Sequence, residues 1–314
     1  MYKVFIDGQA GTTGLRLEQR LTERADIGLI AIKEELRKDE EARLERIAEA
    51  DIVFLCLPDK EAADIAAAAA DAASCRIIDC STAHRTAGGW AYGMPEITGD
   101  ISGFTRLSNP GCHATGFIMS VRPLIDSGLI DPGAAICFHS VTGYSGGGKT
   151  MVEEYESSGD ALKAPRQYAL AQDHKHLPEM LKYSGLDTAP VFSPIVCDFY
   201  CGMLVSVPLP RSAIRSGATA ETIREALAAR YYGCPLVKVR AAGHEFSEAA
   251  GNGYLSGDAF AGRDDIEIFV TGKDDRIDIV SRYDNLGKGA SGAAIQSMNI
   301  LFGLPEETGL VLGA

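Results

Sequence analysis

One cysteine stands in a setting that favours nucleophilic chemistry. Cys112 follows Asn109-Pro110-Gly111 and precedes the apolar run ATGFIMSV. Because Pro110 disfavours a helical Asn109 and Gly111 lets the chain turn, a helix is predicted to begin at Cys112. Amide donors and the positive end of a helix favour a thiolate, which is the form that attacks a carbonyl carbon. The alternative is that Cys112, like Cys56 in VFLCLP, is a small buried hydrophobic residue.

Two histidines share a segment that is typical of a helix entrance. His174 and His176 stand in QDHKHLPEML, where Pro178 suits the first helical turn and Glu179 falls one turn inside. This position disfavours imidazolium, so a neutral histidine there could take a proton from a thiol, with Glu179 orienting it. The spacing does not say which histidine is the acid/base. Two alternatives stay open: a metal site, for which the chain offers no obvious third ligand, and a pair of surface or capping histidines.

Three glycines follow the first predicted strand, YKVFID. Gly8, Gly11 and Gly14 lie between that strand and a helix predicted to begin near Leu15. Glycines in such a loop allow a tight turn and let a pyrophosphate approach the backbone N–H groups at the helix start. The spacing differs from G-x-G-x-x-G, so a plain tight turn is the alternative. The position after the first strand favours a dinucleotide site.

The end of the second predicted strand bears on the choice between NAD and NADP. An acidic residue there holds a ribose 2′-hydroxyl, whereas basic residues hold a 2′-phosphate. The segment AIKEELRKD supplies Lys33, Arg37 and Lys38, together with Glu34 and Glu35. We expect Arg37 and Lys38 to favour NADP. A solvated, charged helix face is the alternative explanation.

Strand-like and helix-like runs alternate through roughly the first hundred residues. This rhythm predicts an α/β fold with a Rossmann-like, doubly wound parallel sheet. From about Leu107 the chain becomes rich in glycine and in β-prone segments such as AAICFHSV and CGMLVSVPLP, which predicts a second, α+β domain. The tail NLGKGASGAAIQSMNILFGL turns helical again, with Ile295, Met298 and Leu301 or Phe302 on one face. We expect it to pack against the first domain.

Composition narrows the classes of protein and partner. The 314 residues include 30 Lys and Arg against 43 Asp and Glu, a net charge of −13. A nucleic-acid partner is therefore not expected. No apolar run approaches the roughly 20 residues that cross a bilayer, and MYKVFIDG does not resemble a signal peptide, so we expect a cytoplasmic protein without a membrane partner. The eight cysteines form no C-x-x-C pair, which argues against disulfides and zinc.

The motifs resemble the N-acetyl-gamma-glutamyl-phosphate reductase family of arginine biosynthesis, in its shorter form. The resemblance covers nearly the whole chain. The matching segments are GQAGTTG at 8–14, CLPD at 56–59, DCSTAHR at 79–85, YGMPEI at 92–97, NPGCHATG at 109–116, SGGGK at 145–149, HKHLPEM at 174–180 and DNLGKGASGAAIQ at 284–296. Related aspartate-semialdehyde dehydrogenases share the architecture and a catalytic cysteine but differ around HKHLPEM.

This resemblance implies an NADP-dependent acyl-phosphate reductase with two domains and no metal. Residues 1–108, completed by the C-terminal helix 286–314, would bind NADPH. Residues 109–285 would carry catalysis and the contacts of a homodimer or homotetramer. The cysteine would attack the acyl phosphate, expel phosphate and form a thioester that hydride converts to an aldehyde. The implied catalytic residues are Cys112, His174, His176 and Glu179, and the implied cofactor contacts are Gly8, Gly11, Thr12, Thr13, Gly14, Arg37, Lys38, Cys56, Pro58, Ser81 and Asn285.

Two basic residues are candidates for binding the phosphate. Arg85 follows the predicted strand CRIIDCS at its carboxyl end, where doubly wound sheets place their ligands, and a guanidinium binds phosphate oxygens in pairs. Related semialdehyde dehydrogenases carry a phosphate-binding arginine in a similar segment. Lys149 in SGGGK is the alternative cation, and a solvated surface arginine is the alternative role of Arg85. Cys201 stands where longer family members have an arginine, so another cation must replace it if that arginine holds substrate.

Two other functions stay open at this point. An aspartate- or aminoadipate-type semialdehyde dehydrogenase would differ only in the shape of its substrate pocket. A catalytically silent NADP-binding redox sensor would bind the cofactor without turnover, and its exposed thiol would respond to oxidants.

Overall fold

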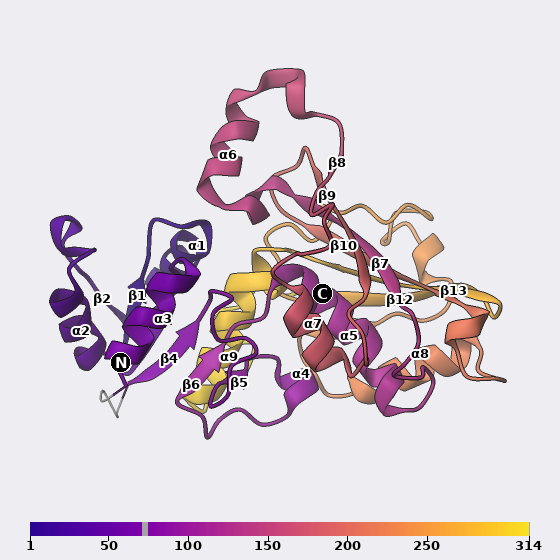
Figure 1. Ribbon diagram of the computed structural model, residues 1–314, viewed down its shortest axis with the longest axis horizontal. Coiled ribbons are helices and arrows are strands. Elements are labelled where there is room, and N and C mark those ends of the chain that lie inside the picture. The colour runs from indigo at the N-terminus through magenta and orange to yellow at the C-terminus, as the bar shows by residue number, and fades with distance from the viewer. Residues whose placement is uncertain (71–74, 314) are drawn as a thin grey trace. The chain divides into compact units, whose positions relative to one another are not determined.

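The computed structural model describes residues 1–70 and 75–313, which divide into two compact units (Figure 1). Unit 1 comprises Met1–Pro110 and Ala290–Leu310, and unit 2 comprises Gly111–Gly289 with the C-terminal residues from Val311 on. Unit 1 is therefore built from two separate stretches of the chain. In the described ranges, no helix is both long enough and apolar enough to cross a membrane.

Unit 1 contains a parallel sheet of six strands in the order β2-β1-β3-β4-β6-β5. The central strand β3, with the sequence IVFL, is buried at every position, as expected for a parallel sheet covered on both faces. The predicted doubly wound α/β class is confirmed. The strands are β1 (Tyr2–Asp7), β2 (Ile27–Ile30), β3 (Ile52–Leu55), β4 (Arg76–Asp79), β5 (Ala91–Tyr92) and β6 (Arg106–Ser108).

Two apolar clusters lie on opposite faces of this sheet. Leu17 of α1 and Met298 of α9 share one cluster, whereas Ile47 of α2 and Ile65 of α3 share the other. The helix α9, from the end of the chain, therefore completes the same layer as α1. The helices of unit 1 are α1 (Thr12–Thr22), α2 (Glu40–Glu49), α3 (Asp59–Ala68), α4 (Pro95–Thr98) and α9 (Gly292–Leu301).

The strand order reverses at β1, because β2 lies on one side of it and β3 on the other. In doubly wound sheets, such a reversal opens a crevice at the carboxyl ends of the strands. Gly8 follows β1 there, and a Cβ on Gly8 would lie 2.3 Å from the carbonyl oxygen of Cys56, which follows β3. Gly8 also has a φ of +94°, so only glycine fits this turn.

Unit 2 contains a mixed sheet of seven strands in the order β11-β12-β13-β10-β7-β9-β8. Neighbouring strands are antiparallel except in the pairs β11 with β12 and β7 with β9. The β-prone segments AAICFHSV and CGMLVSVPLP supply β7 and β10, and the predicted α+β character is confirmed. The strands are β7 (Cys137–Gly143), β8 (Arg166–Gln167), β9 (Val191–Cys197), β10 (Met203–Pro210), β11 (Val237–Val239), β12 (Ile266–Lys273) and β13 (Arg276–Tyr283).

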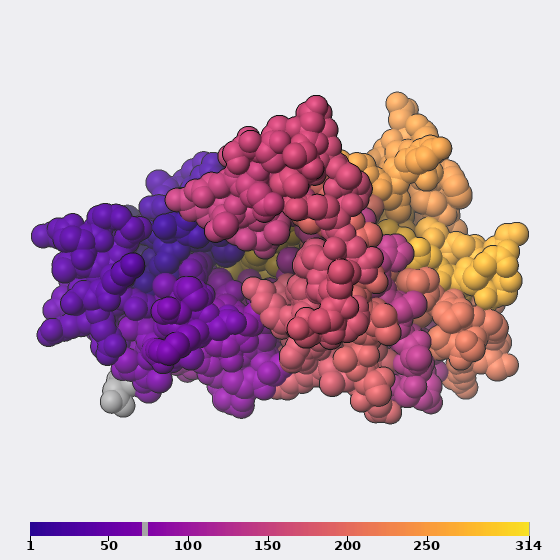
Figure 2. Space-filling model, turned by 45° about the horizontal axis from the view of Figure 1, so that its top comes forward, coloured from indigo at the N-terminus to yellow at the C-terminus, as the bar shows by residue number. Residues whose placement is uncertain are grey.

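Helix α5 is the central helix of unit 2. It packs on β10 and β13 of the sheet and also contacts α7 and α8 (Figure 1). Its side chains are buried almost all round, from His113 to Leu124, with Arg122 as the partly exposed exception. Figure 2 shows the α6 segment in rose and the loop near residue 250 in orange standing out from this unit. The helices of unit 2 are α5 (Cys112–Asp126), α6 (Gly148–Ser157), α7 (Leu177–Ser184) and α8 (Ala220–Arg230).

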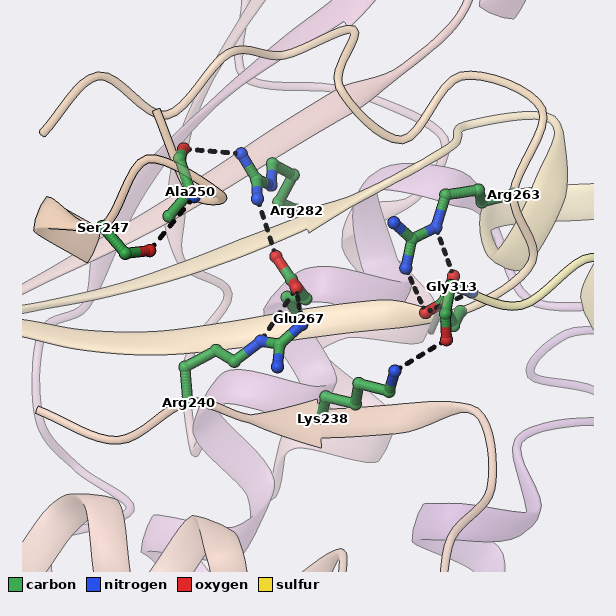
Figure 3. A network of polar contacts seen from close by, with 9 residues as sticks. Lys238, Arg240, Ser247, Ala250, Arg263, Glu267, Arg282 and Gly313 are labelled. Carbon is green, nitrogen blue, oxygen red and sulfur yellow. Dashed lines mark hydrogen bonds and ion pairs between the residues drawn. The ribbon is translucent and has the colours of Figure 1, made fainter. Parts of the chain in front are cut away.

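A buried carboxylate joins the strands at one side of this sheet (Figure 3). Glu267 on β12 accepts hydrogen bonds from Nε of Arg240 at 2.8 Å and from Nη2 of Arg282 on β13 at 2.8 Å. Arg282 also donates to the backbone carbonyl of Ala250 at 3.1 Å. These bonds compensate the burial of the charges and hold the strand that ends at Tyr283.

Candidate active site

Cys112 is the first residue of α5, with Gly111 immediately before the helix. The helix therefore begins where the Asn-Pro-Gly run predicts it. Cys112 is partly exposed, whereas its neighbour His113 is buried. Gly111 has no side chain that could cap the helix, so the N–H groups at the start of α5 need partners from elsewhere in the fold.

Glu179 provides one of these partners. Its side chain lies on α7 with 1% of its surface exposed, and its Oε2 accepts a hydrogen bond from the backbone N–H of Gly111 at 3.1 Å. This bond ties the turn before Cys112 to the helix that follows the histidines. The sequence predicts that Glu179 orients a histidine, and that role remains a prediction beside the observed contact.

Tyr283 supports the first turn of α5 from a distant part of the chain. Its phenol donates to the backbone carbonyl of Cys112 at 2.6 Å and accepts from the backbone N–H of Gly116 at 3.1 Å. Burial, together with the nearby Cys112, raises the pKa of Tyr283 well above its ordinary value, so the phenol stays protonated. A Cβ on Gly116 would lie 2.7 Å from the Tyr283 hydroxyl, which explains the glycine at this position.

The histidines of α5 and of the α7 entrance gather into one cluster. The ring centroids of His174 and His176 lie 4.6 Å apart, and the ring of His113 lies 5.4 Å and 5.6 Å from them. His176 is buried and directly precedes α7, and its backbone N–H donates to Nδ1 of His174 at 3.1 Å. Within residues 1–70 and 75–313, no group of three His, Cys, Asp or Glu side chains is arranged to hold a metal ion.

His113 is the member of this cluster that the sequence motifs did not assign to the site. Its Nδ1 lies 2.6 Å from Oγ of Ser140 on β7, and its Nε2 lies 2.6 Å from the hydroxyl of Tyr168. Burial and the neighbouring His174 lower the pKa of His113 well below its ordinary value. The one signal in the sequence is that His113 directly follows Cys112.

Asn285 is predicted as a cofactor contact, and its side chain lies inside unit 2. Its Oδ1 accepts from the backbone N–H of Gly202 at 2.8 Å, and its Nδ2 donates to Oγ of Ser145 at 3.0 Å. The amide thus joins the turn after β7 to the residue before β10. A Cβ on the nearby Gly289 would lie 2.9 Å from Cβ of Cys112, so this segment packs closely on the cysteine. Contact with the cofactor stays a prediction for Asn285.

The remaining predicted cofactor residues lie in unit 1. The run Gly8 to Gly14 includes the glycines and Thr12 and Thr13, and α1 begins within it without a side-chain cap at Gly11. Cys56 and Pro58 follow β3, and Ser81 follows β4 with its hydroxyl donating to Asp79 at 2.9 Å. Because β1, β3 and β4 are parallel neighbours, their carboxyl ends share one edge of the sheet. The residues predicted to contact the cofactor therefore follow the carboxyl ends of these strands.

The thiol of Cys56 has a raised pKa. A hydrogen bond with the Cys80 thiol and burial both raise the pKa of Cys56 well above its ordinary value. A thiol held in this way is a poor nucleophile. Cys56 fits the structural role that its strand context predicts.

The predicted basic residues have different surroundings. Arg85 of unit 1 is 7% exposed and donates from Nε to the backbone carbonyl of Asn109 at 2.9 Å. Lys149 of unit 2 has 70% of its side chain exposed on α6. Arg37 forms an ion pair with Glu34, and Lys38 is exposed. Phosphate binding by these side chains remains a prediction.

Known proteins match this chain over nearly its full length. The semialdehyde dehydrogenase dimerisation domain matches residues 112–285, and the semialdehyde dehydrogenase NAD binding domain matches residues 28–102. The fold resembles aspartate semialdehyde dehydrogenase II from Vibrio cholerae, with a TM-score of 0.71 and 16% identity over 96% of this chain and 98% of that one. The chain thus has the two-domain architecture of the semialdehyde dehydrogenases.

Curated relatives define the family more narrowly. The chain is 42% identical to "N-acetyl-gamma-glutamyl-phosphate reductase 2" of Nostoc sp., over 98% of this chain and 99% of that protein. It is 40% identical to the protein of the same name in Pseudomonas putida, over 98% of each chain. The chain belongs to the N-acetyl-gamma-glutamyl-phosphate reductase family, as the motifs predict.

Proposed function

We propose that the protein catalyses the NADPH-dependent reduction of N-acetyl-gamma-glutamyl phosphate to N-acetyl-glutamate 5-semialdehyde and phosphate, in arginine biosynthesis. The observation that carries this proposal is Cys112 at the start of a buried helix in the unit that also gathers His174 and His176. The names of relatives that are 40–42% identical support the choice of substrate.

Acyl transfer to Cys112 is the first chemical step of this proposal. The Cys112 sulfur forms a bond with the acyl carbon, and the bond between that carbon and the phosphate oxygen breaks. The thiol proton passes to a histidine, and phosphate leaves with the bonding electron pair. Cys112 then carries the acyl group as a thioester. Glu179 and Tyr283 keep the backbone of the first turn fixed during this exchange.

The hydrogen bond between the two histidines supports different roles for them. Nδ1 of His174 accepts the backbone N–H of His176, so the proton of a neutral His174 lies on Nε2. His174 therefore presents a donor, which suits binding of a substrate oxygen. We assign the acid/base role to His176, which takes the thiol proton in the first step and returns it to the sulfur when the aldehyde leaves.

The residues of unit 1 fit a nicotinamide dinucleotide. Because Gly8 has no Cβ, the backbone beyond β3 can approach it closely, and α1 offers N–H groups without a side-chain cap. When bound, the reduced cofactor supplies a hydride. In this chain, the run from Gly8 to Gly14 would hold its pyrophosphate. Arg85 or Lys149 would hold the phosphate of the substrate, and Arg85 offers the paired geometry of a guanidinium.

The reverse reaction tests this function. The purified protein is expected to reduce NADP with N-acetyl-glutamate 5-semialdehyde only when phosphate is present, because phosphate must cleave the thioester. Absorbance at the wavelength of NADPH measures the rate. A higher kcat/KM for aspartate or aminoadipate semialdehyde would reassign the substrate. Cofactor binding without turnover on any of the three would support the redox sensor instead.

The preference between the two nicotinamide cofactors is a separate prediction. We expect a higher kcat/KM with NADPH than with NADH, because Arg37 and Lys38 follow β2 and can contact a 2′-phosphate. Replacing both by alanine should narrow that preference, since each charge-assisted contact contributes about 1.5–3 kcal/mol. The exposed Lys60 on α3 provides a control substitution. Equal use of both cofactors by the wild-type protein would contradict this prediction.

The proposal also covers the oligomeric state of the protein, its cellular location and the roles of its two domains. The matched dimerisation domain supports an oligomer, and we propose a homodimer or homotetramer. We place the enzyme in the cytoplasm, where its biosynthetic relatives would find their substrate. We also propose that residues 1–108 with 286–314 serve cofactor binding and that 109–285 serve catalysis and assembly.

A further inference from the structure

A chain of three uncharged side chains runs from the sheet of unit 2 to the neighbourhood of Cys112. Ser140 of β7 lies 2.6 Å from Nδ1 of His113, and Nε2 of His113 lies 2.6 Å from the hydroxyl of Tyr168. Ser140 is completely buried and His113 is 3% exposed, whereas Tyr168 is only partly buried. The outer end of this chain is therefore the phenol.

His113 is neutral, which leaves two possible directions for the hydrogen bonds. Burial and the adjacent His174 keep the pKa of His113 well below its ordinary value. A neutral imidazole has one nitrogen that donates and one that accepts. Either Ser140 donates to His113 and His113 donates to Tyr168, or both bonds run the opposite way.

The burial of Ser140 decides between these directions. In the described part of the chain, the His113 ring is the only hydrogen-bond partner of the Ser140 hydroxyl. If His113 donated to Ser140, the serine proton would be buried without an acceptor, which is costly. Ser140 therefore donates to Nδ1, and Nε2–H of His113 donates to the oxygen of Tyr168. The phenol keeps its own proton for a different acceptor.

The Tyr168 phenol lies beside the histidine cluster of the candidate active site. Burial raises the pKa of Tyr168 and the charge of a Cys112 thiolate raises it further, so the phenol keeps its proton and remains a donor. The Tyr168 ring lies 5.9 Å from the ring of His174, between centroids. The phenol therefore belongs to the group of side chains that includes His174 and His113, the residue directly after Cys112.

The backbone around Tyr168 is held in an unfavourable conformation. Ala169 and Gln172 have φ values of 52° and 57°, which side chains rarely adopt. The Gln172 amide holds this turn, because its Nε2 donates to the carbonyl of Phe192 at 2.7 Å and its Oε1 accepts from the N–H of Phe192 at 2.9 Å. Strain that the fold maintains in this way is typical of segments with a functional position.

We infer that Tyr168 is a catalytic residue that donates a hydrogen bond to the carbonyl oxygen of the acyl group on Cys112, and that His113 and Ser140 are positioning residues that aim it. This inference rests on the proposed function. The oxygen gains negative charge when the sulfur attacks and again when hydride arrives, and a fixed donor stabilises that charge. The phenol keeps its proton throughout, so no further reactant is required.

A set of single and double variants tests the inference. Tyr168→Phe removes the donor and keeps the ring, and kcat is expected to fall by about 10²–10³-fold with little change in KM. His113→Phe and Ser140→Ala are expected to lower kcat by about tenfold or more, because each breaks the hydrogen-bonded chain that fixes the orientation of the phenol. In the Tyr168→Phe background, these two substitutions should have no further effect on kcat. Tyr254→Phe removes a phenol that is 84% exposed and serves as the matched control.

A second assay separates this inference from the proposed function. p-Nitrophenyl acetate can acylate a reactive thiol without cofactor or natural substrate, and release of p-nitrophenol measures the step. We expect acylation that Cys112→Ser abolishes, Tyr168→Phe slows at least tenfold, and Tyr254→Phe leaves unchanged. Wild-type acylation without reductase activity would overturn the proposed function while the variants still test the donor. The inference would be overturned if Tyr168→Phe were acylated at the wild-type rate. It would also be overturned if His113→Phe lowered kcat by the same factor in the wild-type protein and in the Tyr168→Phe variant.

Discussion

Replacing Cys112 by serine is expected to lower kcat by about 10⁴-fold or more while NADPH binding stays intact. The sulfur is the atom that carries the acyl group, and a serine hydroxyl at the same place is a far weaker nucleophile near neutral pH. The substitution changes one atom of a partly exposed side chain and nearly keeps its volume, so the fold should persist. Steady-state kinetics and a titration of bound NADPH by fluorescence measure the two effects.

Other cysteines of the chain provide the controls for this experiment. Cys137→Ser changes an exposed thiol on β7 and should leave turnover unchanged. Cys56→Ala should alter thermal stability or the KM for NADPH more than kcat, because Cys56 directly follows β3 and packs against an apolar cluster of unit 1. A Cys112→Ser variant that keeps a sizeable fraction of the wild-type rate would exclude the thioester mechanism.

Alanine substitutions of His174 and His176 are expected to change different kinetic constants. His176→Ala should lower kcat by about 10²–10⁴-fold, since it removes the group that accepts and returns the thiol proton. His174→Ala should mainly raise the KM of the acyl phosphate, because Nε2–H of His174 is the group that can donate to substrate in its neutral form. Measurement of kcat and KM for each variant over a range of pH separates the two effects.

The pH profile adds a further requirement to this assignment. The ascending limb of kcat that reports the base should disappear in His176→Ala and persist in His174→Ala. If the ascending limb disappeared in His174→Ala and persisted in His176→Ala, His174 would be the acid/base and His176 the substrate-binding residue. Wild-type behaviour of both variants would place the acid/base elsewhere in the histidine cluster.

Local sequence signals predicted the parts of the site that local geometry controls. The start of α5 at Cys112 follows from the two residues before it, because a proline restricts the backbone and a glycine lets it turn wherever they occur. The α7 entrance after His176 follows in the same way from Pro178. The alternation of short apolar strands and helices predicted the class of unit 1, since each strand needs only its own composition to be recognised.

The supports of the site depend on strand pairing and could not be predicted in the same way. Tyr283 reaches the first turn of α5 only because β13 and β10 lie beneath that helix. Ser140 meets His113 because its position on β7 faces α5, and a shift of one residue in register would turn it to the other face. Asn285 matched a family motif, but no local pattern predicts its bonds to Gly202 and Ser145.

The construction of unit 1 from two stretches of chain determines when it can fold during synthesis. Its apolar layer beside α1 includes Met298 and Leu301 of α9, which leave the ribosome after nearly all of unit 2. At ordinary rates of translation, the chain between Pro110 and Leu301 takes roughly 10–40 s to synthesise. Apart from the few residues from Val311 on, unit 2 is one continuous stretch from Gly111 to Gly289, which can fold within that interval. The N-terminal strands, by contrast, must wait with the part of this apolar face that α9 covers exposed to solvent.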